Sequence, residues 1–498
     1  MSLSIKQEWV TQTGALITAL DWLDPCASFS GFADQPFALW FDSADTAHPA
    51  GRYSYIAVAP FETISIKQGQ LNGMPVEPFD HLKMRLAHYQ EDWDDLPDNI
   101  KNQLPPFKGG VGGYFGYDLA QGLEQLPPPI APYAIDDAGL PDLMAGLYDV
   151  VLAFDHHAQN CFLLSSGFPE TKAALRAHRA RQRRDWLCEK LAGIPAAPAH
   201  EPLSFPALET PLQSPLSAED YQSRVQKIID YIYAGDIFQA NLAHRFTAKL
   251  NAQDSAFAFY KRLRHVSAAP FAGFFQLGGW ALASASPERF LSCDKEIVEA
   301  RPIKGTRPRQ KDPQADKALA EELRTDQKER AENIMIVDLL RNDISKVCTE
   351  GSIEVPSLCA VESFPNVHHL VSIIQGRLKP DAGATDLLKA CFPGGSITGA
   401  PKIRAMEIIA ELENNCRGPY CGALSFIGFD GVMDSNITIR TPIISGQNIS
   451  FQVGGGITAQ SQPEAEYRET LHKAEGILRA LGLSQSENQN LSHKKSRA

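Results

Sequence analysis

Hydrophobic residues recur every three to four positions in several segments, a spacing that predicts amphipathic helices. The clearest case begins at Ser217, which can cap a helix together with Asp220, and ends at Gly235. Its apolar face is formed by Tyr221, Val225, Ile228, Ile229 and Ile232. Similar patterns predict helices over 174–190, 313–323, 326–342, 385–390, 401–412 and 463–481.

Shorter apolar runs bounded by polar turns predict strands. The runs 148–154 and 161–165 flank the polar turn 155–160 and predict a hairpin. Other strands are predicted over 280–284, 297–306, 423–429, 436–444 and 450–453. Because the predicted helices cluster between groups of strands instead of alternating with them, the pattern favours an α+β fold over a doubly wound sheet.

Six prolines fall between residues 195 and 215, where neither a helix nor a central strand can form. We interpret 195–216 as a linker or a surface crossing between a first portion, 1–194, and a second portion, 217–483. The polar tail 484–498 is predicted to be disordered.

Composition and charge narrow the class of protein. The 498 residues carry a net charge of −12, which argues against binding to nucleic acid or to anionic membranes. No apolar run approaches the roughly 20 residues of a membrane span, and the N-terminus lacks an apolar signal core. Nine cysteines occur without a C-x-x-C pair, so we expect a reduced, cytoplasmic protein of enzyme size. An anionic ligand would then need a local cationic pocket or a metal.

Lys304 is the first candidate for chemistry, because it lies in a strand-like run beside Gly305. A lysine nucleophile must be neutral, which requires burial or nearby cations. In a regular strand, the side chains of Arg301, Arg307 and Arg309 lie on the face opposite Lys304 and would not tune it. The alternative interpretation is a solvated lysine on an edge strand.

Two glycine-rich segments invite a nucleotide interpretation that their residues do not support. The segment 393–402 has the glycine spacing of a P-loop, but Ala400 and Pro401 stand where Lys and Ser/Thr are required. The segment 107–118 has Phe115 where a dinucleotide motif needs its third glycine. The first segment precedes a helix and can still offer backbone N–H groups to a carboxylate, although a plain turn is the alternative.

Carboxylates form the remaining candidates. Glu329/Glu332 and Glu466/Glu469 are spaced i, i+3 on two predicted helices, and two such helices together could hold Mg²⁺. Solvated helix faces are the alternative. Glu288, just after a strand, could act as a general acid or pair with Arg289 on the surface. His369 could be a catalytic or a packed histidine.

These motifs resemble those of the chorismate-utilising enzymes, which include anthranilate synthase component I, aminodeoxychorismate synthase component I, and the isochorismate and salicylate synthases. The similar segments follow the family's order through the second portion, and two segments of the first portion extend the resemblance. They are GRYSYIAV (51–58), FKGGVGGYFGYD (107–118), SPERF (286–290), PIKGTRPR (302–309), AENIMIVDLLRND (331–343), HLVS (369–372), GGSITGAPKIRAM (394–406), GPYCGALSFIGFDG (418–431), IRT (439–441), VGGGI (453–457) and EYRETLHKA (466–474).

The lysine at position 304 separates members of the family. Anthranilate synthases read P-I-A-G-T at this motif, whereas aminodeoxychorismate synthases carry lysine, as this chain does. The resemblance therefore implies a transferase that aminates chorismate at C4 with ammonia, through a covalent Lys304 intermediate, in p-aminobenzoate and folate biosynthesis. Anthranilate synthase is the alternative within the family, followed by isochorismate or salicylate synthesis.

The resemblance also implies residue roles. Lys304, Glu288 and His369 would be catalytic, with Glu288 as the acid and base at the C4 hydroxyl. Mg²⁺ would be held directly by Glu332 and Glu469, with help from Glu329 and Glu466. Substrate binding would fall to Thr306, Thr398, Gly399, Tyr420, Arg440, Gly454, Gly456 and Lys473.

The implied fold is a two-layered β-sandwich with surrounding helices, to which both portions contribute strands. No G-x-C-x-G glutaminase motif occurs, so the resemblance implies a separate glutamine amidotransferase subunit that forms a heterodimer and supplies ammonia. Some members hold tryptophan in the first portion, in regions that correspond to 41–43 and 269–271 here. Outside this family, a catalytically silent binding subunit is the remaining alternative, which the joint presence of Lys304, Glu288, Glu332 and Glu469 disfavours.

Overall fold

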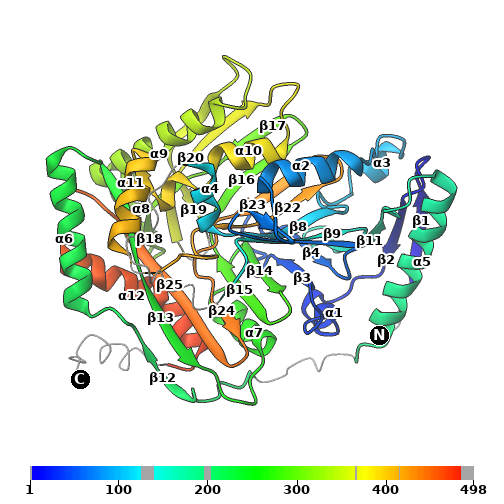
Figure 1. The fold of residues 1–498 in the computed structure, drawn as a ribbon, viewed down its shortest axis with the longest axis horizontal. Helices are drawn as coiled ribbons and strands as arrows, with labels where there is room; N and C mark the ends of the chain where they lie inside the picture. Colours follow the sequence, from blue (N-terminus) through cyan, green and yellow to red (C-terminus); the bar gives the residue numbers. More distant parts are fainter. Residues whose placement is uncertain (1–2, 125–138, 196–202, 365–366, 414, 484–498) are drawn as a thin grey trace.

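Two antiparallel β-sheets form the centre of the protein in a computed structural model (Figure 1). The structure describes residues 3–124, 139–195, 203–364, 367–413 and 415–483. The predicted disordered tail, 484–498, lies outside the described residues, as does part of the proline-rich segment.

The first sheet has thirteen strands among the described residues. Its strands are, in order, β1 (Ile5–Val10), β2 (Leu16–Leu20), β11 (Asn160–Ser165), β10 (Val150–Asp155), β4 (Tyr53–Ala57), β3 (Leu39–Asp42), β14 (Phe271–Gln276), β15 (Trp280–Ser286), β24 (Ile443–Ser445), β25 (Asn448–Ile457), β13 (Gln239–Lys249) and β12 (Thr210–Gln213), with β21 (Gly399–Ala400) beside β13.

The second sheet carries the predicted catalytic residues Lys304 and His369 on β18 and β20, at one of its ends. Its strands are, in order, β18 (Ile303–Pro308), β20 (Val367–Arg377), β17 (Ile297–Ala300), β16 (Arg289–Asp294), β23 (Met433–Asn436), β22 (Ala423–Gly428), β8 (Gly110–Phe115), β9 (Leu143–Tyr148), β5 (Glu62–Lys67), β6 (Gln70–Leu71) and β7 (Met74–Pro75), with β19 (Glu354–Ser363) beside β20.

Both sheets combine strands from either side of the proline-rich segment. In the first sheet β14 pairs with β3, so that Ala272 lies opposite Asp42. In the second sheet β22 pairs with β8, so that Ala423 lies opposite Phe115. The two portions of the sequence therefore share one framework, as the resemblance implied. The limits assigned to those portions remain a sequence prediction.

Side chains that alternate along the strands build the interior. Tyr55 and Ala57 of β4 point into the core between the sheets, where they meet Tyr114 and Phe426 of the second sheet. Ile56, between them in sequence, points to the outer face of the first sheet. The α+β sandwich that the sequence pattern and the resemblance predicted is confirmed.

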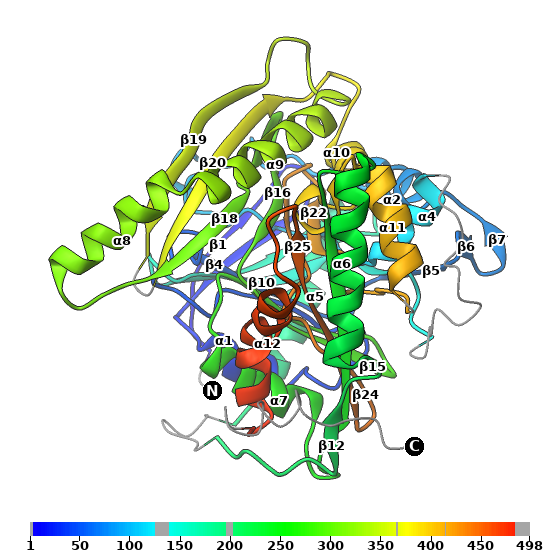
Figure 2. The same cartoon turned by 90° about the vertical axis from the view of Figure 1, so that its left-hand side faces the viewer.

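Helices cover the outer faces of both sheets. Apolar residues of α1, α5, α7 and α12 pack on the first sheet, and those of α2, α9 and α10 pack on the second. In Figure 2, α6, α11 and α12 stand beside one another, and α8 and α9 extend across another side. The helices are α1 (Pro25–Ser30), α2 (Pro78–His88), α3 (Asp98–Lys101), α4 (Ala120–Leu123), α5 (Ala173–Ala192), α6 (Ala218–Ala234), α7 (Ala256–Val266), α8 (Pro313–Thr325), α9 (Gln327–Ser345), α10 (Ala384–Cys391), α11 (Lys402–Leu412) and α12 (Pro463–Ala480).

Local signals placed several of these elements correctly. Helix α6 begins after Ser217, whose side chain accepts a hydrogen bond from the Asp220 backbone, and it ends at Gly235 in a left-handed conformation. The hairpin of β10 and β11 follows the predicted runs. Among the described helices, none is both long and apolar enough to cross a membrane.

Two predicted strands are interrupted. The run 297–306 forms β17 and β18, which are separated at Arg301 and Pro302. The run 436–444 ends as β23 in the second sheet and resumes as β24 in the first, so the strand prediction for Arg440 is wrong. The backbone must turn where it passes between the sheets, and Arg440 has a positive φ of 51° there.

Candidate active site

The predicted site residues come from both sheets, from the connections between their strands, and from helices α9 and α12. Lys304 lies on β18, an edge strand of the second sheet. Its Nζ is 3.7 Å from Oε2 of Glu332 on α9, and only 16% of the lysine side chain is exposed. The alternative of a fully solvated edge lysine is therefore wrong: the side chain points against a helix.

Gly305 produces a bulge that changes which side chains face α9. The register between β18 and β20 shifts between Lys304 and Thr306. Arg307 consequently reaches α9 as well, with its Nη1 3.9 Å from Oε1 of Glu329. The expectation that Arg307 lies on the face opposite Lys304 is wrong, because regular alternation does not hold across a bulge.

Glu288 lies at the centre of several positive charges. Oε1 of Glu288 accepts a hydrogen bond of 3.0 Å from the Ser396 hydroxyl, in the glycine-rich segment. Burial raises the pKa of Glu288, while Ser396 and the nearby charges of Lys304, Lys473 and Arg440 oppose this rise. The surface pair with Arg289 does not form, since Arg289 binds Asp434 instead.

The two pairs of glutamates differ in their surroundings. Glu332 lies within 4 Å of two ammonium groups, those of Lys304 and Lys328. On α12, Glu466 is buried and accepts a hydrogen bond of 2.6 Å from Ser461. Glu469 is more exposed and pairs with Lys473 at 2.8 Å.

The same lysines act on glutamates of both α9 and α12. Burial raises the pKa of Glu469, but the nearby Lys473, Lys328 and Lys304 outweigh it and lower the pKa overall. Burial raises the pKa of Glu466, and the charge of Glu469 adds to this. Lys304 and Lys328 therefore lie near both Glu332 and Glu469.

This arrangement fits a divalent cation by the chemistry of its donors. Mg²⁺ takes oxygen ligands and commonly keeps several waters, so one or two protein carboxylates are enough. Glu332 and Glu469 provide such a pair. Among the residues that the structure describes, no three His, Cys, Asp or Glu side chains are close enough to hold a metal together. The magnesium ligand set therefore remains a prediction.

His369 and Thr306 form a pair on neighbouring strands. The Thr306 hydroxyl and Nδ1 of His369 are 2.9 Å apart. Burial lowers the pKa of His369 to about 4, so its ring is neutral near pH 7. The neighbouring His368 points to the other side of β20 and contacts Asp316. Only His369 therefore lies on the side of Arg440, whose charge contributes to its lowered pKa.

The glycines of β25 alternate between two faces. A Cβ at Gly455 would lie 3.4 Å from both Glu466 and Lys473, so Gly455 is the glycine that faces α12. The predicted Gly454 and Gly456 point toward β13, although the Gly454 carbonyl accepts a hydrogen bond of 2.9 Å from Lys473. Strand alternation was the signal that could have identified Gly455.

The remaining predicted binding residues lie around the glycine-rich segment. Thr398 is fully buried, and its carbonyl accepts a hydrogen bond of 2.7 Å from the Asn241 backbone. Gly399 has a φ of 153° and passes so close to Gln239 that a Cβ would clash with its carbonyl. Tyr420 is buried, and burial raises the pKa of its hydroxyl.

Three side chains of this site were not identified from the sequence. Lys328 carries no motif that sets it apart from an ordinary surface residue, and Ser396 lies within the quoted segment 394–406 but was not assigned a role there. Gln239 is fully buried next to Gly456, and both atoms of its amide have no hydrogen-bond partner among the described residues. A buried amide without partners is costly, so it is available to a bound molecule.

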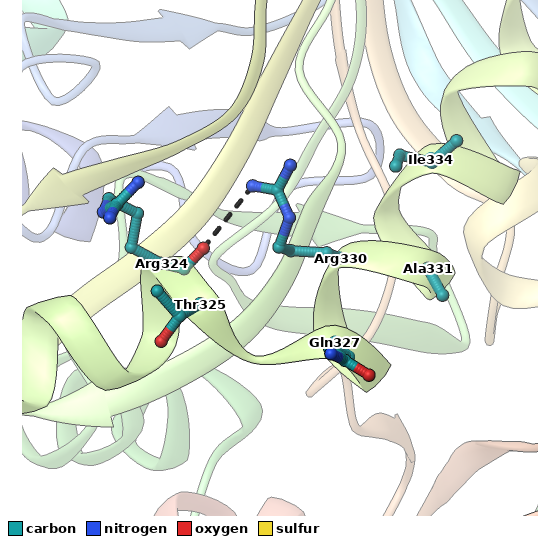
Figure 3. A pocket seen from close by; sticks show the side chains of 6 residues that line it. All are labelled: Arg324, Thr325, Gln327, Arg330, Ala331 and Ile334. Atoms are coloured by element: carbon teal, nitrogen blue, oxygen red, sulfur yellow. Dashed lines mark hydrogen bonds between the residues drawn. The ribbon is translucent and has the colours of Figure 1, made fainter.

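A separate hollow lies at the junction of α8 and α9 (Figure 3). On α9 it is lined by Arg330, Ala331 and Ile334. These residues occupy the helix face opposite Glu329 and Glu332, given 3.6 residues per turn. The hollow therefore does not belong to the candidate active site.

The sequence was compared with models of known protein families. Residues 36–479 match the family described as chorismate binding enzyme. The chain belongs to the chorismate-binding enzyme family. The match covers every residue of the candidate site and all strands of the two sheets except β1 and β2.

Individual relatives and a solved structure extend the match over nearly the whole chain. Aminodeoxychorismate synthase component 1 from Escherichia coli is 39% identical over 481 residues, covering 95% of this chain and 99% of that protein. Anthranilate synthase component 1 from Thermus thermophilus is also 39% identical, over 465 residues, covering 93% and 96%. Anthranilate synthase component I from Streptococcus pneumoniae superposes with a TM-score of 0.71 at 33% identity, covering 86% and 92%.

Proposed function

We propose that this enzyme aminates chorismate at C4 with ammonia to give 4-amino-4-deoxychorismate, the precursor of p-aminobenzoate in folate biosynthesis. The observation that carries the proposal is the position of Lys304. Its partly buried ammonium group lies beside Glu332 and within electrostatic reach of Glu288. The 39% identity to aminodeoxychorismate synthase component 1 supports the same activity.

Lys304 would act as the nucleophile of the first half-reaction. Once the Lys304 ammonium group has given a proton to solvent, its amine forms a bond to C2 of chorismate, each of the two ring double bonds shifts by one position, and the C4–O bond breaks. The departing hydroxide takes a proton from Glu288 and leaves as water. The raised pKa of Glu288 supports this role, because it keeps the carboxyl protonated to a higher pH than usual.

Ammonia would complete the second half-reaction. It forms a bond to C4, the two double bonds return to their original positions, and the C2–N bond to Lys304 breaks. The incoming ammonia releases a proton to the Glu288 carboxylate, which restores the acid form of Glu288, and the amine of Lys304 departs neutral. The balance is one chorismate and one ammonia consumed, with one aminodeoxychorismate and one water formed.

The carboxylates of chorismate would be bound by Arg440, Lys473 and Mg²⁺. Arg440 and Lys473 lie close enough to Glu288 to influence its pKa, which supports a role for both in binding chorismate. Mg²⁺, when held by Glu332 and Glu469, would supply positive charge to the C1 carboxylate of chorismate. Lys304 and Lys328 lie within 4 Å of Glu332, and Lys473 pairs with Glu469 at 2.8 Å.

The ammonia would come from a separate glutamine amidotransferase subunit in a heterodimer. The chain has no G-x-C-x-G motif, and its curated relatives are themselves named as component 1. A tryptophan site remains a prediction. The two segments assigned to it do adjoin, since the Ser43 hydroxyl donates a hydrogen bond of 3.3 Å to the Pro270 carbonyl.

Anthranilate synthesis is the second candidate, because the Thermus thermophilus relative is as similar in sequence as the aminodeoxychorismate synthase from Escherichia coli. The products distinguish the two. Amination at C4 retains the enolpyruvyl group, whereas anthranilate formation releases pyruvate. A product assay with chorismate, Mg²⁺ and an ammonium salt tests the proposal, and stoichiometric pyruvate would refute it.

A further inference from the structure

Among the residues that the structure describes, no strand pairs with one stretch of β13 on one of its two sides. On that side β21 pairs with Gln239 and Ala240, and β12 pairs with Thr247 and Lys249. The opposite side is fully paired with β25. Backbone N–H and C=O groups in the interval would be left without partners in the interior, which is energetically costly.

Two charged side chains, Glu413 and Arg417, fill this gap in the sheet. Oε1 of Glu413 accepts a hydrogen bond of 2.8 Å from the Ala243 N–H, and Nη2 of Arg417 donates one of 2.9 Å to the Asn241 carbonyl. The two side chains also bind each other through hydrogen bonds of 2.8 and 2.9 Å. They therefore act in the place of a strand, and both are buried.

The same guanidinium reaches the residues predicted to bind substrate. Nη1 of Arg417 donates a hydrogen bond of 2.9 Å to the carbonyl of Ile397, directly before Thr398. The Thr398 carbonyl in turn accepts from the Asn241 N–H. The guanidinium carbon of Arg417 also lies 5.6 Å from the centre of the Tyr420 ring. The backbone N–H of Tyr420 donates a hydrogen bond to the Arg417 carbonyl. One ion pair thus links β13, the glycine-rich segment and Tyr420.

We propose that the Arg417–Glu413 pair positions the chorismate-binding residues Thr398 and Tyr420, an inference that rests on the proposed function. The pair is a positioning element, because it acts through these residues and touches no reacting atom. A guanidinium is required, since its planar fork binds Glu413 in two places while donating to two carbonyls. Lysine preserves the charge but cannot make all four contacts.

The test compares two conservative changes in the full chain. Arg417→Lys alters the proposed positioning pair. Arg262→Lys is the matched control, because Arg262 is also buried, pairs with Asp254, and donates a hydrogen bond of 2.9 Å to the carbonyl of Ala480. That pair lies at the C-terminal end of α12, beyond the residues of the candidate site. The measurements are kcat and KM for chorismate, together with the thermal unfolding temperature.

Both variants are expected to unfold at lower temperature than the wild-type chain. Only Arg417→Lys is expected to raise KM for chorismate by about tenfold or more, with kcat changed less than threefold, because displaced binding groups weaken substrate capture. If Arg417→Lys does not fold, Glu413→Gln provides the same comparison, since it keeps the size of the side chain and an acceptor oxygen for Ala243.

Two results separate the inference from the proposed function. An active wild-type chain with an unchanged KM in folded Arg417→Lys, or an equal rise of KM in Arg262→Lys, would overturn the positioning role alone. A wild-type chain that does not convert chorismate would overturn the proposed function itself, whatever the variants do.

Discussion

Replacement of Lys304 by alanine separates catalysis from stability. The side chain makes one long ion pair, 3.7 Å from Glu332, and Glu332 keeps a second ammonium partner at 3.9 Å in Lys328. Exposed ion pairs contribute about 0–1 kcal/mol, and breaking a fully buried pair costs about 3–5 kcal/mol. With its second partner retained, Glu332 does not become an unpaired charge. We therefore expect a loss of only about 1–2 kcal/mol in the free energy of unfolding.

The expected loss of rate is much larger. If Lys304 forms the covalent bond to C2, alanine removes the only route from chorismate to the intermediate. A fall of about 10³-fold in kcat corresponds to about 4 kcal/mol in the activation barrier, since each factor of ten is 1.36 kcal/mol. A change of that size in rate, with little change in stability, cannot result from partial unfolding.

The assay follows aminodeoxychorismate formation with saturating ammonium salt, alongside thermal unfolding of the same samples. Lys328→Ala is the comparison, because it removes an ammonium group from the same glutamate. We expect it to change kcat by less than about tenfold. Intact-mass measurement of the wild-type chain with chorismate but without ammonia should show an adduct of chorismate less one water, which is absent in Lys304→Ala.

The outcome that refutes this reasoning is a Lys304→Ala chain that retains more than a tenth of the wild-type rate. An equal loss of rate in Lys328→Ala would also refute it, because the effect would then come from the charge on Glu332 instead of from a nucleophile.

Three further predictions concern charge. Glu332→Gln and Glu469→Gln should each raise the Mg²⁺ concentration for half-maximal rate by about tenfold or more, measured by titration, whereas the exposed Glu321→Gln should not. Because burial raises the pKa of Glu288, the rate should fall as pH rises through that pKa, and Glu288→Gln should abolish this dependence along with most of the activity. Burial lowers the pKa of His244 to about 3, so the unfolded chain binds a proton first as pH falls below about 6.5. Stability should therefore decrease between pH 6.5 and 3, and denaturant unfolding should show a weaker decrease in His244→Gln.

Features set by local sequence were predictable. The capping residue Ser217, the C-terminal Gly235 and the polar turn between β10 and β11 each act within a few residues, and the structure follows them. The sequence predicts the candidate site as a set of residues, because its motifs resemble those of a family. Their chemical roles remain predictions.

Features that depend on sheet order were not predictable. Arg440 lies where the chain passes from one sheet to the other, and nothing in the run 436–444 marks that crossing. The bulge at Gly305, which turns Arg307 toward α9, depends on the register with β20. Glu413 and Arg417 were not identified from the sequence, because only the tertiary fold places them against the unpaired stretch of β13.

The most direct test of the central claim is a product assay on the purified chain alone. Chorismate, Mg²⁺ and an ammonium salt are incubated at mildly alkaline pH, products are separated by chromatography with mass detection, and pyruvate is measured in parallel. The account predicts exchange of the C4 hydroxyl for an amine without pyruvate. Anthranilate with an equal amount of pyruvate would contradict the role assigned to Lys304, while leaving the family assignment intact.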